Sequence, residues 1–137
     1  EALPKGFTFN NDGTKMYVVG WSNDSVYQYS LSTAFVVSTA SYDSVSLNVS
    51  ATLLNPATIR FNNDGTKAFI LSWNDDTMYQ YSLSTAFDIS TASYDSKSLS
   101  FASLDTATTS FAFNSDETKM YILGQSGDNV YQYSTNF

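Results

Sequence analysis

The sequence contains no cysteine and no histidine. The absence of cysteine excludes disulfides, thiolate metal sites and thiol nucleophiles. The absence of histidine removes the commonest general base and transition-metal ligand. Basic residues are also few, since six stand against 13 acidic ones and give a formal net charge of −7. An acidic surface repels phosphate backbones, so we expect no nucleic-acid partner.

Long apolar runs are missing as well. No uninterrupted apolar segment approaches the roughly 20 residues of a membrane helix, and no signal-peptide pattern opens the chain, so we expect no membrane insertion. Aromatic residues, in contrast, are abundant: ten Tyr, ten Phe and two Trp make up 16% of the 137 residues. With 42% hydrophobic residues, this composition indicates a packed, strand-rich protein.

One segment occurs three times along the chain. "FNNDGTKMYVVG" begins at Phe9, "FNNDGTKAFILS" at Phe61 and "FNSDETKMYILG" at Phe113, so the interval is 52 residues each time. The stretch "YQYSLSTAF" also recurs unchanged, from Tyr27 and again from Tyr79. A repeat of about this length is typical of stacked architectures, either solenoids or propellers.

Each repeat contains short apolar runs separated by turn residues, and their alternation predicts strands. In the first repeat the predicted strands are residues 6–9, 15–20, 25–30 and roughly 43–50. The second is apolar on both faces and the fourth on only one, so we expect exposure to rise from the first strand to the last.

Turn residues connect these predicted strands. Asn-Asn-Asp-Gly after the first strand predicts a tight hairpin, and where Glu117 replaces Gly we expect a type I turn that avoids the left-handed conformation. The connection to the fourth strand is rich in Ser and Thr, which predicts a compact turn or a single helical turn. We expect Phe35 and Phe87 to anchor this connection in the core.

Four antiparallel strands per repeat, most buried at the first two and most exposed at the fourth, predict an all-β fold of β-propeller blades. "NNDGTKMYVVG" followed by "NDSVYQYSL" resembles the YVTN and surface-layer type of β-propeller repeat, and the whole unit is similar to repeats in phage and environmental viral structural proteins. The resemblance implies a blade and no particular activity, because it consists of turn and core residues. The expected blades are residues 6–57, 58–109 and 110–137, the last without its outer strand.

Three blades are too few to close a ring, since propellers carry roughly four to eight. The two open blade faces would present Phe, Tyr and Met to water, and such patches are normally interfaces. We therefore expect a homodimer that closes a six-bladed ring about a twofold axis. The alternative is that the chain, which begins with Glu1 and not with Met, is a segment of a longer polypeptide.

Loops between the second and third strands share one end of the predicted ring. An aromatic side chain flanked by amides and carboxylates suits a sugar, because its ring stacks on C–H faces while Asn and Asp bind hydroxyls. The alternative is that the Trp side chains cover blade edges and the polar residues form turns. The candidate ligand-binding residues are Trp21, Asn23, Asp24, Arg60, Trp73, Asn74, Asp75, Asp76, Gln125 and Asp128.

Arg60 belongs to this set because it stands where the other repeats have Thr8 and Ala112. A lone guanidinium near the ring axis suits an anion or a substrate carboxylate, and the alternative is a paired or water-facing charge. Asp75 and Asp76 with neighbouring Asn oxygens offer ligands to Ca²⁺, which needs six to eight oxygens. A complete ligand series is missing, so we assign no metal site and no cofactor.

Three functions remain open. We expect a noncatalytic β-propeller module, and not an enzyme, that is extracellular or on a virion surface and recognises a glycan or a surface protein through these loops. The second is a purely structural spacer or shell protein, which near-identical repeats suit. The third is a lactonase-like hydrolase, because some YVTN-type propellers resemble lactonases. Such an enzyme would need a metal or an acid/base cluster near Arg60.

Overall fold

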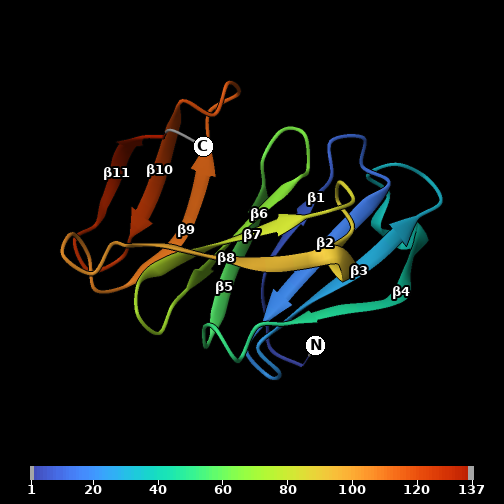
Figure 1. The fold of residues 1–137 in the computed structure, drawn as a ribbon, viewed down its shortest axis with the longest axis horizontal. Coiled ribbons are helices and arrows are strands. Elements are labelled where there is room, and N and C mark those ends of the chain that lie inside the picture. The colour runs from blue at the N-terminus through green and yellow to red at the C-terminus, as the bar shows by residue number, and fades with distance from the viewer. Residues whose placement is uncertain (1, 136–137) are drawn as a thin grey trace.

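The computed structural model describes residues 2–135. Three antiparallel sheets follow one another along the chain, and Figure 1 shows them side by side across the molecule. The strands of the first sheet are, in order, β1 (Pro4–Phe9), β2 (Lys15–Gly20), β3 (Ser25–Leu31) and β4 (Ala40–Asn48). Those of the second are β5 (Pro56–Phe61), β6 (Lys67–Ser72), β7 (Thr77–Leu83) and β8 (Ala92–Ser100). Those of the third are β9 (Thr108–Phe113), β10 (Lys119–Gly124) and β11 (Asn129–Ser134). The all-β prediction is therefore confirmed.

The strand limits agree with the prediction best at the second strand of each sheet, which begins and ends as expected. The first strands begin two residues earlier, at Pro4 and Pro56, because a bulge follows each proline and shifts the register. The fourth strand of the first sheet begins at Ala40 and not near residue 43, because a bulge with Ser44 in the left-handed conformation interrupts its alternation.

The hairpin turn between the first two strands places one residue in the left-handed region in every sheet. The φ angles are 71° at Gly13, 72° at Gly65 and 57° at Glu117. Glycine adopts this conformation freely because it has no Cβ. The prediction for Glu117 was wrong, since the third turn keeps the same shape as the other two. Its carboxylate accepts a hydrogen bond from the Asn63 N–H of the second sheet, a contact that helps to hold this backbone in place.

A single 3₁₀ turn precedes the fourth strand, at Val37–Thr39 in the first sheet and at Ile89–Thr91 in the second, as the Ser and Thr content predicts. Phe87 beside the second turn is half-buried, whereas Phe35 is 57% exposed, so the expectation that both are anchored in the core was wrong for Phe35. It differs because no sheet of the described chain packs on its side of the first sheet. Among residues 2–135, neither helical turn has the length or apolar character of a membrane-crossing helix.

The core lies between neighbouring sheets. One cluster joins the first sheet to the second and includes Tyr17, Val19, Val26, Ile59, Ala68 and Ile70. A second cluster joins the second sheet to the third through counterparts of these residues, namely Phe69, Leu71, Met78, Phe111, Met120 and Ile122. Burying one such side chain stabilises the fold by about 1.5–3 kcal/mol. The same face-to-face packing is thus used twice in the chain.

Candidate functional site

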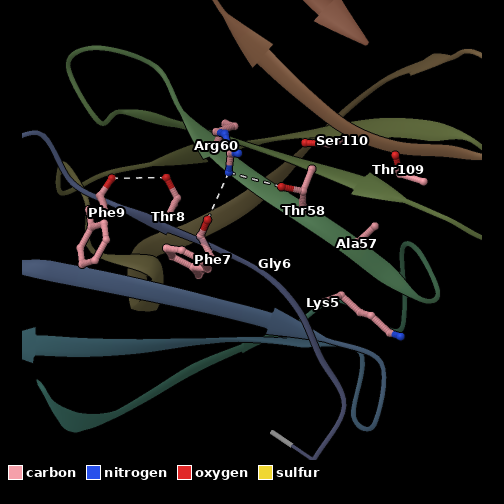
Figure 2. A pocket seen from close by; sticks show the side chains of 10 residues that line it. All are labelled: Lys5, Gly6, Phe7, Thr8, Phe9, Ala57, Thr58, Arg60, Thr109 and Ser110. Carbon is pink, nitrogen blue, oxygen red and sulfur yellow. Dashed lines mark hydrogen bonds between the residues drawn. The ribbon is translucent and has the colours of Figure 1, made fainter. Parts of the chain in front are cut away.

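An open hollow lies where the first strands of the three sheets meet. β1, β5 and β9 contact one another in sequence order, and the hollow they line has a volume of about 530 Å³. Figure 2 shows its lining, in which the polar side chains are Lys5, Thr8, Thr58, Arg60, Thr109 and Ser110. The described residues that line it include no carboxylate. The hollow is therefore positively charged and rich in hydroxyl groups.

Arg60 is held in this hollow by its own strand and by β1. Alternation along β5 places it on the face opposite the fully buried Ile59. Its Nη1 donates to the backbone oxygen of Ile59 at 2.8 Å, to that of Phe7 at 3.3 Å and to Thr58 Oγ1 at 3.3 Å. Burial lowers the pKa of the Arg60 guanidinium from its ordinary value, yet an arginine stays charged at neutral pH.

Only one nitrogen of the Arg60 side chain is bound within the described chain. Within residues 2–135, Nη2 and Nε make no hydrogen bond, while Nη1 is fixed by three acceptors. A guanidinium held in this way can bind two oxygens of one anion at once. The anion-binding role of Arg60 stays a prediction.

The two candidate tryptophans lie together beside this hollow. The ring centroids of Trp21 and Trp73 are 5.3 Å apart with an interplanar angle of 37°. Lys5 Nζ lies 3.8 Å from the centroid of the Trp21 ring, a cation–π contact that the sequence did not indicate. A smaller hollow of about 220 Å³ is lined by Trp21 and Trp73, and it shares Lys5, Ala57 and Thr109 with the hollow around Arg60. The two hollows therefore adjoin.

Two of the candidate aspartates join neighbouring sheets. The Asp24 carboxylate accepts a hydrogen bond from the Asn55 N–H at 2.7 Å. The Asp76 carboxylate accepts bonds from the Thr108 N–H at 2.6 Å and from the Thr108 hydroxyl at 2.9 Å. Asp128 is their counterpart in the third sheet and has a left-handed backbone like theirs, with φ 51°. In the described part of the chain its carboxylate accepts no hydrogen bond.

The other candidate residues are placed around the loops. Asn23 Nδ2 donates to the Tyr27 hydroxyl at 3.0 Å, and Asp75 accepts a bond from the Tyr79 hydroxyl at 2.6 Å. These contacts hold the loops against the third strands of their sheets. Residues 2–135 contain no group of three or more acidic side chains that converge on a metal site.

Asn74 and Gln125 are exposed, and no hydrogen bond of their side chains is found within residues 2–135. Gln125 lines, with Asp128, a further open hollow of about 410 Å³ on the third sheet, which shares only Thr109 with the hollow around Arg60. The structure thus brings Arg60 and the tryptophan pair to adjoining hollows, and it leaves Gln125 and Asp128 at a different one.

Asp105 is a polar residue of this region that the sequence analysis missed. It is buried, and its carboxylate accepts bonds from the N–H groups of Ala107 at 2.9 Å, Ser126 at 3.2 Å and Gly127 at 2.8 Å. Desolvation opposes ionisation, but these backbone donors prevail and lower the pKa of Asp105 from its ordinary value. A signal was available, because the repeat counterpart of Asp105 is the buried apolar residue Leu53.

Solved structures share this fold, whereas no protein-family model and no curated protein sequence matches the chain. The chain superposes on a putative 6-phosphogluconolactonase from Bacteroides uniformis with a TM-score of 0.71 and 11% identity, over 97% of this chain and 37% of that one. A putative 6-phosphogluconolactonase from Bacteroides fragilis gives a TM-score of 0.72 at 10% identity, over 97% and 35%. The periplasmic gluconolactonase of Pseudomonas aeruginosa gives 0.68 at 13% identity, over 97% and 36%.

These likenesses define the fold. The chain is a partial β-propeller of the kind found in 6-phosphogluconolactonase-like proteins, and it spans little more than a third of their length. The predicted propeller fold is thereby confirmed at this level. The finer resemblance to YVTN and surface-layer repeats, and the link to phage and viral proteins, has no support from a family match.

The prediction of a noncatalytic binding or structural module is contradicted, and so is the prediction that the chain is not an enzyme. Proteins named 6-phosphogluconolactonase and gluconolactonase share its fold. The sequence argument counted the repeated residues and the lack of His and Cys against chemistry, and it did not take into account that proteins named lactonases use the same fold.

Proposed function

We propose that this protein is part of a lactonase-like hydrolase, with a sugar lactone as substrate in the hollow at β1, β5 and β9. One observation carries the proposal: the Arg60 guanidinium, fixed through Nη1 and open at Nη2 and Nε, lies among hydroxyl groups in that hollow. The fold shared with proteins named lactonases supports the same reaction class.

The chemistry of lactone hydrolysis fits an arginine. Water adds to the ester carbonyl carbon and loses a proton, and the carbonyl oxygen becomes an oxyanion. The C=O bond then re-forms as the ring C–O bond breaks and the ring oxygen takes up a proton, which gives a hydroxy acid. A second water molecule carries the proton, because no carboxylate lines the described hollow. A preorganised donor at that oxyanion is worth about 10²–10³ in rate. In the proposal, the open donors of Arg60 stabilise this charge, and the hydroxyl groups of Thr58 and Ser110 bind the hydroxyl groups of the sugar.

A phosphorylated lactone carries a second anion that the same arginine can bind. Because the chain has a net charge of −7, its general field repels anions. The basic residues Arg60 and Lys5 would then be the local attraction for such a substrate. Oxyanion stabilisation and phosphate binding share one chemistry, and a pair of substrates with and without phosphate distinguishes them.

We further propose that the hollow works within a closed ring of six blades formed by two copies of the chain. The blades are then residues 6–57, 58–109 and 110–137 of each copy, of which residues 136–137 lie outside the described part. Closing the ring surrounds the hollow at Arg60 with inner strands on all sides and excludes bulk water, which strengthens electrostatic interactions there. An extracellular or virion-surface location, and a partner other than a second copy, stay predictions from the sequence.

Lactone hydrolysis can be followed by titrating the acid released, with 6-phosphogluconolactone and gluconolactone as the two substrates. We expect the wild-type protein to hydrolyse at least one of them above the buffer rate, and Arg60→Gln to lose most of that activity. Arg60→Lys keeps the charge but not the planar fork, so partial activity is expected. Lys97→Gln removes an exposed charge on β8 and is the matched control.

The pattern of loss identifies the role of Arg60. A loss restricted to the phosphorylated substrate, as a raised KM, indicates phosphate binding. An equal loss of kcat with both substrates indicates oxyanion stabilisation. Wild-type rates equal to buffer with both substrates would contradict the proposed function.

A further inference from the structure

The third sheet has an apolar face that the described chain does not cover. In the first sheet, the corresponding face packs on the second sheet, and three of its residues are 0% exposed: Tyr17, Val19 and Val26. Their counterparts at the repeat interval in the third sheet are 36%, 47% and 65% exposed: Tyr121, Leu123 and Val130. The residue types are kept, and only the covering sheet is missing.

The first sheet lacks a cover on its opposite face. Phe7 is 61% exposed, whereas its counterpart Ile59 in the second sheet is 0% exposed. Val37 is 57% exposed, whereas its counterpart Ile89 is 1% exposed. This face contains an apolar hollow of about 430 Å³, whose lining includes Phe7, Met16, Val18 and Val37. It is the face that the second and third sheets each bury against the sheet before them.

We propose that a second copy of this chain covers both faces, and that Tyr121 and Asp128 of each copy fasten the third sheet to the first sheet of the other. The proposal specifies the contact through which the ring of the proposed function closes, and it rests on that closure. A twofold axis makes the same contact twice, so no apolar face remains open. Counterpart contacts within the chain supply the geometry.

The tyrosine contact has a template between the first two sheets. The Tyr17 hydroxyl donates a hydrogen bond to the Phe87 carbonyl oxygen in the loop before the 3₁₀ turn of the second sheet. Position 69, the next counterpart, is Phe and has no hydroxyl, but the hydroxyl returns at Tyr121. The first sheet of a second copy offers the matching carbonyl at Phe35. A sheet placed as in the template therefore brings the Tyr121 hydroxyl to that carbonyl.

A second template lies in the same interface. The Ile89 N–H of the second sheet donates to Gln28 Oε1 of the first sheet at 3.2 Å. The counterparts are the Val37 N–H and Gln132, and Gln132 is exposed in the third sheet. The same placement thus supplies an acceptor for the start of the exposed 3₁₀ turn at Val37–Thr39.

Asp128 gives an independent indication of the missing sheet. Asp24 and Asp76 each accept a backbone N–H at the start of the next sheet, at 2.7 Å and 2.6 Å. Asp128 has the same backbone conformation, yet its carboxylate accepts no hydrogen bond from any of residues 2–135. The segment that leads into β1 of a second copy is the counterpart of the segments that the other two aspartates bind. The interface is therefore apolar in the middle and polar at Tyr121 and Asp128.

Light-scattering mass measurement across a concentration series tests the proposal. We expect the wild-type chain of 15.1 kDa to show twice that mass. Leu123→Asp places a charge in the proposed contact and should give the mass of one chain. Leu54→Asp makes the same change at an exposed loop residue outside the contact and should keep the mass of two chains.

Tyr121→Phe keeps the packing and removes only the hydroxyl. Its dimer dissociation constant should rise roughly 10- to 100-fold, the effect of losing the two hydrogen bonds that the twofold axis generates. Tyr131→Phe, whose hydroxyl donates to Leu104 in the same chain, should leave the dissociation constant unchanged. Circular dichroism confirms that each variant is folded. The proposal would be overturned if the wild-type protein had the mass of one chain or a mass above that of two chains. It would also be overturned if Leu123→Asp kept the mass of two chains. Because mass is read without substrate, a dimer without lactonase activity refutes only the proposed function.

Discussion

Asp76 and Thr108 are joined by two hydrogen bonds, one from the backbone N–H and one from the hydroxyl of Thr108 to the same carboxylate oxygen. Both residues are buried, with exposures of 6% and 0%. The bonds link the loop after β6 to the start of β9, so a loop residue of one sheet holds the first strand of the next. Sheet-to-sheet packing in this protein thus has a polar contact at its edge as well as an apolar core.

Replacing Asp76 by alanine should destabilise the protein. The Thr108 N–H would remain buried without an acceptor, which costs about 1–3 kcal/mol of the free energy of unfolding. The exposed neighbour provides the control, because Asp75→Ala removes only a bond to the Tyr79 hydroxyl at the surface. Urea denaturation of both variants measures the difference. Equal stability of the two variants would show that the Asp76 contact does not hold the sheets together.

Gly65→Ala should also destabilise the fold. An added Cβ would lie 2.3 Å from the Phe87 ring, and the backbone at Gly65 has φ 72°, a conformation that costs a non-glycine residue about 1–2 kcal/mol. Thermal unfolding should therefore show a clear decrease in Tm. Ser115→Ala lies in the corresponding turn of the third sheet, is exposed and has no positive φ, so its Tm should stay near that of wild type.

Asp105 should make stability depend on pH in the acid range. Its folded-state pKa is lowered by three backbone donors, so its contribution is fully present above the pKa of the unfolded chain, about 4, and is lost as the pH falls through the lower folded value. Asp105→Asn should therefore be less stable than wild type at pH 7. The difference in the free energy of unfolding between wild type and Asp105→Asn should become smaller at lower pH. A difference that stays constant or widens on acidification contradicts this role.

Lys5 over Trp21 gives a prediction that can be read by fluorescence. The cation–π contact at 3.8 Å is worth about 0.5–1 kcal/mol at an exposed site. Lys5→Gln should lower the stability by no more than this amount and should change the tryptophan emission. Lys97→Gln, far along the sequence on β8, should leave the emission unchanged. An unaltered spectrum in Lys5→Gln would indicate that the contact is not populated in solution.

Repetition made the fold predictable. β2 and its counterparts are continuous apolar runs that begin at a lysine and end at Gly or Ser, and these limits were predicted correctly. The fourth strands were displaced because their bulges at Ser44 and Ser96 place non-glycine residues at φ 58° and 56°, which a period-two pattern does not anticipate. The prediction for the Glu117 turn was wrong because it considered only the cost of a left-handed backbone at a non-glycine residue and not the contact to Asn63.

One candidate residue stood out in the sequence because it breaks the repeat. Arg60 was recognised because its counterparts are Thr8 and Ala112, and the structure places it at the hollow between the inner strands. Asp24 and Asp76 were grouped with the rim because they occupy turns, but their partners, 31 and 32 residues further on, lie in the next sheet. A partner at that separation follows from the packing of two sheets and cannot be read from one repeat.

A crystal structure of the 137-residue chain tests the central claim most directly, because it locates whatever covers Tyr121 and Phe7. The account predicts a second copy related by a twofold axis, with the Tyr121 hydroxyl within hydrogen-bond distance of the Phe35 carbonyl oxygen of that copy and Asp128 bound to the segment that leads into its β1. Both apolar faces left open to solvent, or a second copy bound through other surfaces, would contradict it.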